Sequence, residues 1–309
     1  MKTVFMFSGQ GAQYMGMGKE LYENFECAKE VFDRADEVLG FSIKDMCFEN
    51  REELDKTENT QPAILTVSTA CLKVLEEKGI KPDYVAGLSL GEYSAHVASG
   101  SISFDDAVAL VKKRGKYMTE AVPFGVGGMY AIMGLDRETV LECCKEVSDI
   151  GYVAPANYNA PGQIVIAGVK EAVFKASEIA KEKGAKLTVE LNVSGPFHTE
   201  LLKPASEKLA KELENIEFKN MEIPVITNVT GNVIENNEDI KPLLIKQVMS
   251  PVKWEDTIKT LESLGVDTFI EVGPGKALSG FVKRTLKGVT ILNVEDMKSL
   301  EKTLSKLNV

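Results

Sequence analysis

Residues 84–92 read Tyr84-Val85-Ala86-Gly87-Leu88-Ser89-Leu90-Gly91-Glu92, and this segment indicates the fold class. Its first three residues form a short apolar run, as a buried strand does. The residues from Glu92 to Ser99 predict a helix, which Gly100 ends. Gly87 and Gly91 allow the chain to turn sharply between the strand and the helix. Strand, turn and helix in this order are typical of an α/β fold.

The same order of elements extends along most of the chain. Residues 3–7 predict a buried strand, helical spacing follows from Leu21 to Phe32, and a long amphipathic helix starts at Thr60-Gln61-Pro62. After residue 196, predicted strands at 224–228, 268–272 and 290–294 alternate with helices near 200–214 and 239–248, after Trp254 and from residue 276. We therefore assign residues 1–124 and 196–309 to one large α/β domain.

Residues 125–195 follow a different order. We predict strands at 129–133, 152–156, 163–167 and 186–193, and helices at 137–147 and 170–183. The order β-α-β-β-α-β is that of a ferredoxin-like unit. The sequence therefore predicts a small subdomain inserted into the larger domain, with the cleft between them as the default place for a ligand.

Composition excludes several classes of protein. The 309 residues contain 36 Lys and Arg against 46 Asp and Glu, a net charge of −10, which argues against a nucleic-acid binder. No segment reaches the roughly 18 apolar residues of a membrane span, and the first apolar run is too short for a signal peptide. The five cysteines contain no Cys-x-x-Cys pair. We expect a cytoplasmic protein with reduced, structural thiols and no membrane association.

Ser89 is the candidate nucleophile, because Gly87-x-Ser89-x-Gly91 matches the nucleophile-elbow pattern. Between a strand and a helix, its hydroxyl would stand exposed at a helix N-terminus. Backbone N–H groups there stabilise a developing oxyanion. The alternative is an ordinary turn from strand to helix.

A serine nucleophile needs a base, and the chain offers two histidines. His96 lies about two turns along the helix that follows Ser89, and we expect it to be a surface or satisfied helix residue. His198 follows Gly195-Pro196 in a loop where the inserted subdomain ends, so that it can face Ser89 across the cleft. A three-histidine metal site is impossible with two histidines, and we expect no metal.

Two further segments carry candidate groups. Gly9-Gln10-Gly11 follows a predicted strand, but the dinucleotide fingerprint fails because Tyr14 stands where a third glycine is required. The loop can still supply a backbone N–H to an oxyanion hole. Arg114 lies in a helical run among apolar residues, and if it is buried it needs an anionic partner, for which a carboxylate suits the guanidinium.

Together these motifs resemble the malonyl-CoA:acyl carrier protein transacylases, the acyltransferase family of bacterial fatty-acid synthesis. The matching segments follow one another over nearly the whole chain, at residues 7–13, 59–63, 87–92, 113–115, 156–159, 161–163, 195–198, 247, 251–254 and 271–275. The resemblance implies a hydrolase-like α/β domain interrupted by a ferredoxin-like subdomain, which agrees with the pattern of predicted elements.

The resemblance also implies a Ser-His dyad. Ser89 would attack the malonyl thioester, and His198 would take the serine proton while the backbone carbonyl of Gln247 holds the imidazole. The backbone N–H groups of Gln10 and Leu90 would form the oxyanion hole.

The substrates follow from the same resemblance. They are malonyl-CoA and the phosphopantetheine thiol of acyl carrier protein, used in turn, with no resident cofactor and a monomeric enzyme. Arg114 would pair with the free carboxylate of the malonyl group. Met118, Asn157 and Phe197 match acyl-pocket positions, and Phe197 would crowd an α-methyl branch. One departure is Leu88, where most relatives carry histidine.

Other functions remain open at this stage. A serine thioesterase or esterase can use Asp136 or Asp149 as a third catalytic member, although more than a third of the chain follows His198. An acyltransferase of a polyketide pathway would carry the same motifs. A non-catalytic module that binds carrier protein is a third alternative. Basic residues are candidates for docking an acidic carrier protein, namely Lys183, Lys186, Lys283, Arg284 and Lys287.

Overall fold

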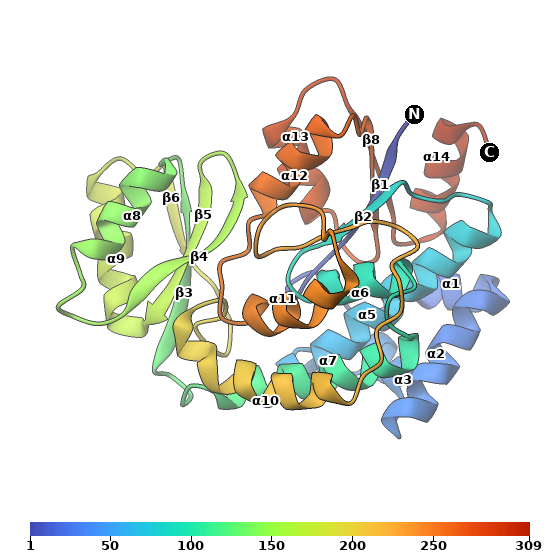
Figure 1. Cartoon of the computed structure of the whole chain (residues 1–309), viewed down its shortest axis with the longest axis horizontal. Helices are drawn as coiled ribbons and strands as arrows, with labels where there is room; N and C mark the ends of the chain where they lie inside the picture. Colours follow the sequence, from blue (N-terminus) through green and yellow to red (C-terminus); the bar gives the residue numbers. More distant parts are fainter.

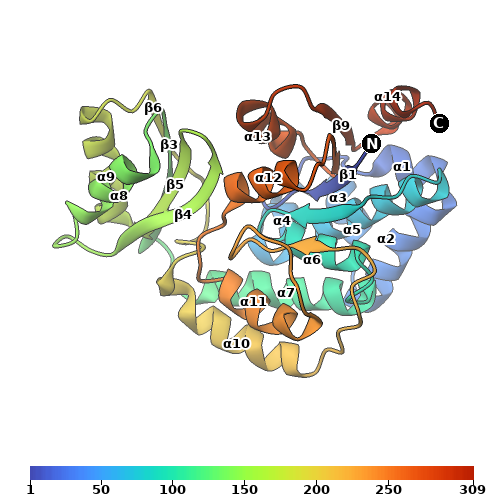
Figure 2. The same ribbon diagram turned by 45° about the horizontal axis from the view of Figure 1, so that its top comes forward.

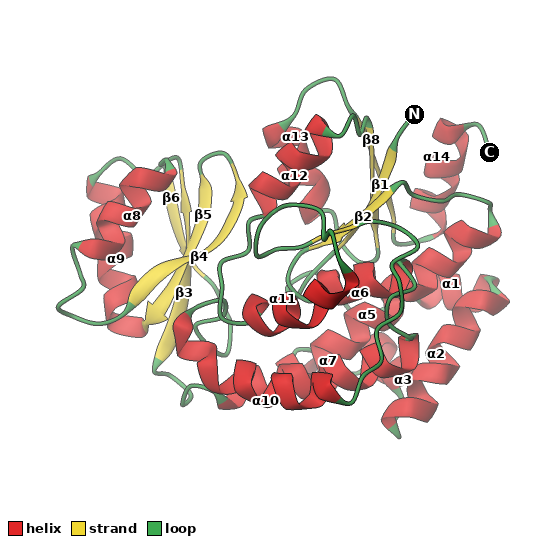
Figure 3. Cartoon of the chain, in the orientation of Figure 1, coloured by secondary structure: helices red, strands yellow, loops and turns green.

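The computed structural model describes residues 1–309 and contains two separate β-sheets (Figure 3). The larger sheet is entirely parallel. Its strands lie in the order β7 (Val225–Ile226), β2 (Tyr84–Gly87), β1 (Thr3–Phe7), β8 (Thr268–Val272) and β9 (Thr290–Val294). Strand β1 is buried along its whole length, which explains its continuous apolar sequence.

Helices cover both faces of this sheet. Because successive side chains of a strand point to opposite faces, Phe5 and Phe7 pack into the main core, while Val4 and Met6 pack into a second core beneath α12 and α13. The helices of the large domain are α1 (Lys19–Asn24), α2 (Glu26–Leu39), α3 (Ile43–Glu49), α4 (Arg51–Leu54), α5 (Thr57–Glu77), α6 (Gly91–Ala98), α7 (Phe104–Glu120), α10 (Lys203–Glu214), α11 (Ile240–Gln247), α12 (Trp254–Ser263), α13 (Ala277–Thr285) and α14 (Met297–Leu307). None of them is both long and apolar enough to cross a membrane.

The smaller sheet is antiparallel and forms a separate lobe with two helices (Figure 1). Its strands lie in the order β4 (Val153–Ala160), β5 (Gln163–Val169), β3 (Gly127–Met133) and β6 (Leu187–Glu190). Helices α8 (Arg137–Lys145) and α9 (Lys170–Glu182) share a core with this sheet. The chain order β-α-β-β-α-β confirms the predicted ferredoxin-like unit. Both chain termini lie on the large lobe, away from the small one (Figure 2).

The small lobe contacts the large one along the edge strand β4. The backbone N–H of Tyr158 donates to the carbonyl of Val252 over 2.9 Å, and the N–H of Val252 donates to Ala156 over 2.8 Å. These bonds form a short parallel bridge between Asn157 and Val252. The subdomain is therefore anchored at its edge strand as well as by its two chain connections.

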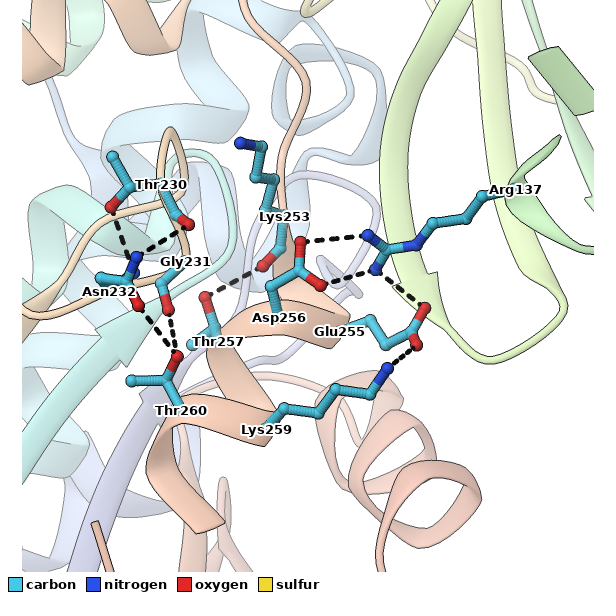
Figure 4. Close-up of polar contacts among 10 residues, drawn as sticks. All are labelled: Arg137, Thr230, Gly231, Asn232, Lys253, Glu255, Asp256, Thr257, Lys259 and Thr260. Atoms are coloured by element: carbon cyan, nitrogen blue, oxygen red, sulfur yellow. Dashed lines mark hydrogen bonds and ion pairs between the residues drawn. The ribbon is translucent and has the colours of Figure 1, made fainter. Parts of the chain in front are cut away.

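An ion-pair cluster reinforces this junction (Figure 4). Arg137, the first residue of α8, donates from Nη2 to Glu255 over 3.0 Å and to Asp256 over 2.8 Å, at the start of α12. Its guanidinium also lies 4.5 Å from the ring centroid of Tyr158. Both carboxylates stand in the first turn of α12, so their negative charges also interact favourably with the positive end of the helix dipole.

Several predicted elements differ from the structure; strand β4, for example, continues to Ala160, beyond the predicted end at residue 156. The expected helix from Leu21 to Phe32 is divided between α1 and α2, because Phe25 adopts an extended backbone conformation. Helix α5 begins at Thr57 and continues through Pro62, which has no N–H and so removes one hydrogen bond of the helix. Strand β3 begins at Gly127, two residues before the predicted start at residue 129. The domain limits at residues 124/125 and 195/196 stay a prediction.

Candidate active site

The loops after β1 and β2 meet at the carboxyl edge of the large sheet. Phe7 pairs with Gly87 in the parallel register, and the N–H of Leu88 donates to the Phe7 carbonyl over 3.0 Å. A cavity of about 420 Å³ opens here between the two lobes. Residues of both lobes line it, including Ser89 and Phe281 from the large domain and Met129 and Val165 from the small sheet.

The two glycines of the elbow permit the close approach of β1, β2 and α6. A Cβ atom on Gly87 would lie 1.9 Å from the backbone of Gly91, and one on Gly91 would lie 2.0 Å from the carbonyl oxygen of Phe7. Between them, Ser89 has a φ angle of 54°, in the left-handed region of backbone conformation that residues other than glycine rarely adopt. The elbow is therefore a strained turn that the surrounding structure must hold in place.

Asn228 holds the elbow from behind. The N–H of Ser89 donates to Oδ1 of Asn228 over 2.6 Å, and Nδ2 of Asn228 donates to the carbonyl of Gly87 over 2.7 Å. The side chain thus bridges two backbone groups of the turn, the Ser89 N–H and the Gly87 carbonyl. Sequence reasoning missed Asn228, and its one signal was its position at the end of a predicted strand.

His198 lies within hydrogen-bond reach of Ser89. Its Nε2 is 2.7 Å from the Ser89 Oγ, and its Nδ1 is 3.0 Å from the backbone oxygen of Gln247. A carbonyl oxygen can only accept, so Nδ1 carries the proton and Nε2 accepts from the serine hydroxyl. Burial, together with the nearby charge of Arg114, lowers the pKa of His198 to about 4. At neutral pH the imidazole is therefore uncharged and able to act as a base.

Arg114 is buried on α7 and faces the same serine. Its Nη2 donates to the Ser89 Oγ over 3.2 Å and to Oε1 of Gln247 over 3.0 Å, while Nη1 donates to Oε1 of Gln61 over 2.8 Å. Its Nε has no partner, and the guanidinium lies 5.2 Å from the ring centroid of Tyr93. Burial lowers the pKa of Arg114. All three hydrogen-bond acceptors are neutral, so the expected carboxylate partner is not supplied by direct contact within the chain.

Two residues that line the cavity with Ser89 have unpaired backbone N–H groups. The N–H groups of Gln10 and Leu90 donate to no other group of the chain, and both residues line the cavity with Ser89. The loops that carry them are pressed together, since a Cβ atom on Gly9 would lie 2.4 Å from the Leu88 carbonyl oxygen. The Leu90 donor lies at the N-terminus of α6 and the Gln10 donor lies in the loop after β1, and free N–H groups of this kind can stabilise an oxyanion.

The three predicted acyl-pocket residues line the same cavity. Met118, Phe197 and Asn157 are all buried beside Ser89. Nε2 of Gln61 donates to the Met118 sulfur over 3.5 Å, and Oε1 of the same side chain accepts from Arg114. Gln61 therefore connects Met118 to Arg114. The structure therefore places the three predicted residues around one cavity. Gln61, which was named from the sequence only as part of Thr60-Gln61-Pro62, contacts one of them.

Glu92 is a further buried group that sequence reasoning did not assign. Its carboxylate accepts from Nε2 of Gln247 over 2.7 Å, and burial raises its pKa to about 7. The side chain of Gln247 also donates to the carbonyl of Ser89 over 2.9 Å. Gln247 was predicted to act through its backbone carbonyl, and its side chain proves to contact three other site residues.

His96 was expected to be a surface or a satisfied helix residue, and the surface alternative is wrong. Its side chain is fully buried, and its Nδ1 lies 2.9 Å from the hydroxyl of Ser101. Burial lowers the pKa of His96 to about 3. The reason is that α6 lies inside the domain, where its residues from Gly91 to His96 are all buried. His96 is a buried core residue whose Nδ1 is hydrogen-bonded and whose Nε2 has no partner, and it has no hydrogen bond to Ser89.

The structure also bears on the possible metal ligands, the cysteines and the candidate docking residues. No group of three His, Cys, Asp or Glu side chains is arranged to hold a metal ion. The five cysteines are free thiols, and burial raises the pKa of Cys71 and Cys144 to about 12. Among the basic residues considered for docking, Lys183 is paired with Glu142 and Glu146.

The chain is similar to known proteins over nearly its whole length. A family model described as the acyl transferase domain matches residues 4–303. The chain is 50% identical over 308 residues to the malonyl CoA-acyl carrier protein transacylase of Bacillus subtilis, an alignment that covers 99% of this chain and 97% of that protein.

Solved structures agree with the sequence comparisons. The malonyl CoA-acyl carrier protein transacylase from Clostridium perfringens matches with a TM-score of 0.97 and 52% identity, covering 100% of this chain and 98% of that one. A malonyl-transacylase solved in complex with its type II polyketide acyl carrier protein matches with a TM-score of 0.96 and 43% identity, covering 99% and 100%.

Proposed function

The chain belongs to the acyl transferase family, as a malonyl-CoA–acyl carrier protein transacylase, and we propose that Ser89 carries the malonyl group between the two substrates. One observation carries this assignment of the site. The Ser89 hydroxyl lies between the neutral imidazole of His198 and the guanidinium of Arg114, at 2.7 and 3.2 Å. A base and a cation on one nucleophile suit an acyl donor that itself bears a negative charge.

The first half-reaction acylates the enzyme. As the Ser89 Oγ attacks the thioester carbonyl carbon, its proton passes to Nε2 of His198. The N–H groups of Gln10 and Leu90 stabilise the oxyanion of the tetrahedral intermediate. The C–S bond then breaks, and the imidazolium returns the proton to the CoA thiolate. The Gln247 carbonyl accepts from Nδ1 throughout, so that no carboxylate is required to orient the base.

Arg114 selects the acyl group. A desolvated guanidinium with neutral partners gains a charged acceptor when the malonyl carboxylate binds. An acetyl group leaves that positive charge without compensation, so the site favours malonyl. Phe197 narrows the cavity beside the base and would disfavour an α-methyl branch, although pockets reject one methyl by only about 1–3 kcal/mol.

The second half-reaction reverses the first with a different thiol. His198 takes the proton of the phosphopantetheine thiol of acyl carrier protein, and the sulfur attacks the malonyl-serine ester. The tetrahedral intermediate collapses, and the proton returns to the Ser89 Oγ. The kinetics should be ping-pong. We further propose that the enzyme is a cytoplasmic monomer, because one chain supplies every group of the site and all five cysteines are free.

Mass spectrometry tests this function. Incubation with malonyl-CoA should add one malonyl group to the Ser89 peptide, and subsequent addition of holo acyl carrier protein should remove it and produce malonyl-carrier protein. The Ser89→Ala variant should remain unmodified. Release of free malonate without transfer to the carrier would instead establish a thioesterase, and absence of any acylation would overturn the proposed reaction.

A further inference from the structure

Glu92 lies behind the nucleophile and does not line the cavity. It stands in the first turn of α6 and is fully buried. Its Oε2 accepts from Nε2 of Gln247 over 2.7 Å and from the backbone N–H of Asn228 over 3.1 Å, while its Oε1 has no partner. The carboxyl therefore joins two residues that each contact Ser89 by another route.

The orientation of the Gln247 amide depends on these neighbours. Its Oε1 accepts from Arg114, and its Nε2 donates to the Ser89 carbonyl and to Glu92. In the reversed orientation the NH₂ group would face the guanidinium, and the oxygen would face two acceptors. Each donor and acceptor of the amide would then be mismatched, which is costly in a buried site.

Through its contact with Asn228, Glu92 also helps to hold the elbow in place. Glu92 accepts from the backbone of Asn228, whose side chain bridges the Ser89 N–H and the Gly87 carbonyl. Asn228 lies after β7 and Gln247 ends α11, so neither position is set by the elbow itself. Glu92 therefore links both segments to α6, the helix that follows the nucleophile, in addition to their direct contacts with Ser89.

We propose that Glu92 is a positioning residue for malonyl transfer, which holds the side-chain oxygen of Gln247 against Arg114 and so presents the guanidinium to the substrate carboxylate. The proposal rests on the proposed function of Arg114 and Ser89. Glu92 acts through Gln247 and does not touch the substrate. Because Oε2 can accept in the ionised and in the protonated form, an amide of the same shape should retain most of this role.

Three substitutions of Glu92 separate the role of its hydrogen-bond acceptor from the role of its side-chain volume. Glu92→Leu removes the acceptor and should lower kcat/KM for malonyl-CoA about tenfold, mainly through KM, with a much smaller effect on acetyl-CoA. Glu92→Gln keeps an acceptor and should stay within about threefold of the wild type. Glu92→Asp keeps the charge but shortens the reach, so it should lower the malonyl-to-acetyl ratio even if the leucine variant does not fold.

Glu271 provides the matched control. It is also fully buried, burial raises its pKa to about 7, and it accepts from the backbone of Leu278 and Ser279 without contacting Arg114 or Ser89. Glu271→Leu should lower the melting temperature, as Glu92→Leu should, but leave the malonyl-to-acetyl ratio unchanged. An unchanged ratio in both Glu92→Leu and Glu92→Asp would overturn the proposal. Failure of the wild type to load malonyl would overturn the proposed function instead.

Discussion

Arg114 donates from Nη2 to the Oγ of Ser89 over 3.2 Å, so the cation that we assign to the substrate carboxylate touches the nucleophile itself. The same positive charge helps to lower the pKa of His198. One side chain is therefore placed to affect both substrate choice and the protonation of the base. Each of these effects can be measured separately.

Replacement of Arg114 should change acyl selectivity. Arg114→Ala removes a charge-assisted contact with the malonyl carboxylate, so kcat/KM for malonyl-CoA should fall about 100-fold, while acetyl transfer is spared or raised. Rates of Ser89 acylation with both thioesters provide the measurement. Lys113→Ala, which removes the neighbouring cation paired with Glu212 at the surface, is the matched control and should keep the malonyl preference. An Arg114 variant with that preference intact would contradict the assigned role.

The pH profile should report the base. The pKa of His198 is lowered to about 4, so kcat/KM should be flat through neutral pH and fall only as the imidazole becomes protonated near that value. Removal of a nearby positive charge favours the imidazolium, and Arg114→Met should therefore move the acidic limb to higher pH. Acetyl-CoA is the substrate to use, because its binding does not require Arg114. An unshifted limb in Arg114→Met would exclude this electrostatic effect.

Asn228 should stabilise the strained elbow. Asn228→Ala leaves the Ser89 N–H and the Gly87 carbonyl without partners, and should lower the free energy of unfolding by about 1–3 kcal/mol. Ser89 acylation should slow as well, because the nucleophile loses its fixed position. Urea unfolding and single-turnover loading measure the two effects. Asn232→Ala, at an exposed position, should change stability by no more than about 0.5 kcal/mol.

Glu271 should make stability depend on pH. Burial raises its folded-state pKa from 4.5 to about 7. Below pH 4.5 the carboxyl is protonated in both states, and between these values the unfolded chain loses the proton first. This group therefore lowers the free energy of unfolding as pH rises through the window. Since Glu271→Gln does not titrate, the stability of the variant relative to the wild type should increase across the window and level off above it. A pH-independent difference would contradict the raised pKa.

The local pattern of the sequence was sufficient for the elements around the nucleophile. A short apolar run, two glycines that flank Ser89 and a following amphipathic stretch specify strand, turn and helix through interactions within a few residues. The order of elements then predicted both sheets. Local patterns were less informative at Phe25 and Pro62, where the surrounding packing determines whether a helix breaks or continues.

What the sequence determined by itself was therefore the α/β order, the inserted β-α-β-β-α-β unit and the serine of the elbow, because each depends on residues that are neighbours in the chain. For the groups around that serine, elimination and family resemblance suggested His198, Arg114 and Gln247, but their contacts with it are visible only in the tertiary structure. His198 is 109 residues away in sequence and Gln247 is 158, and their distances to Ser89 depend on the packing of entire elements. The burial of His96 and the contacts of Glu92 and Asn228 depend on the same packing, since a side chain's environment is set by segments that its own sequence neighbours do not specify.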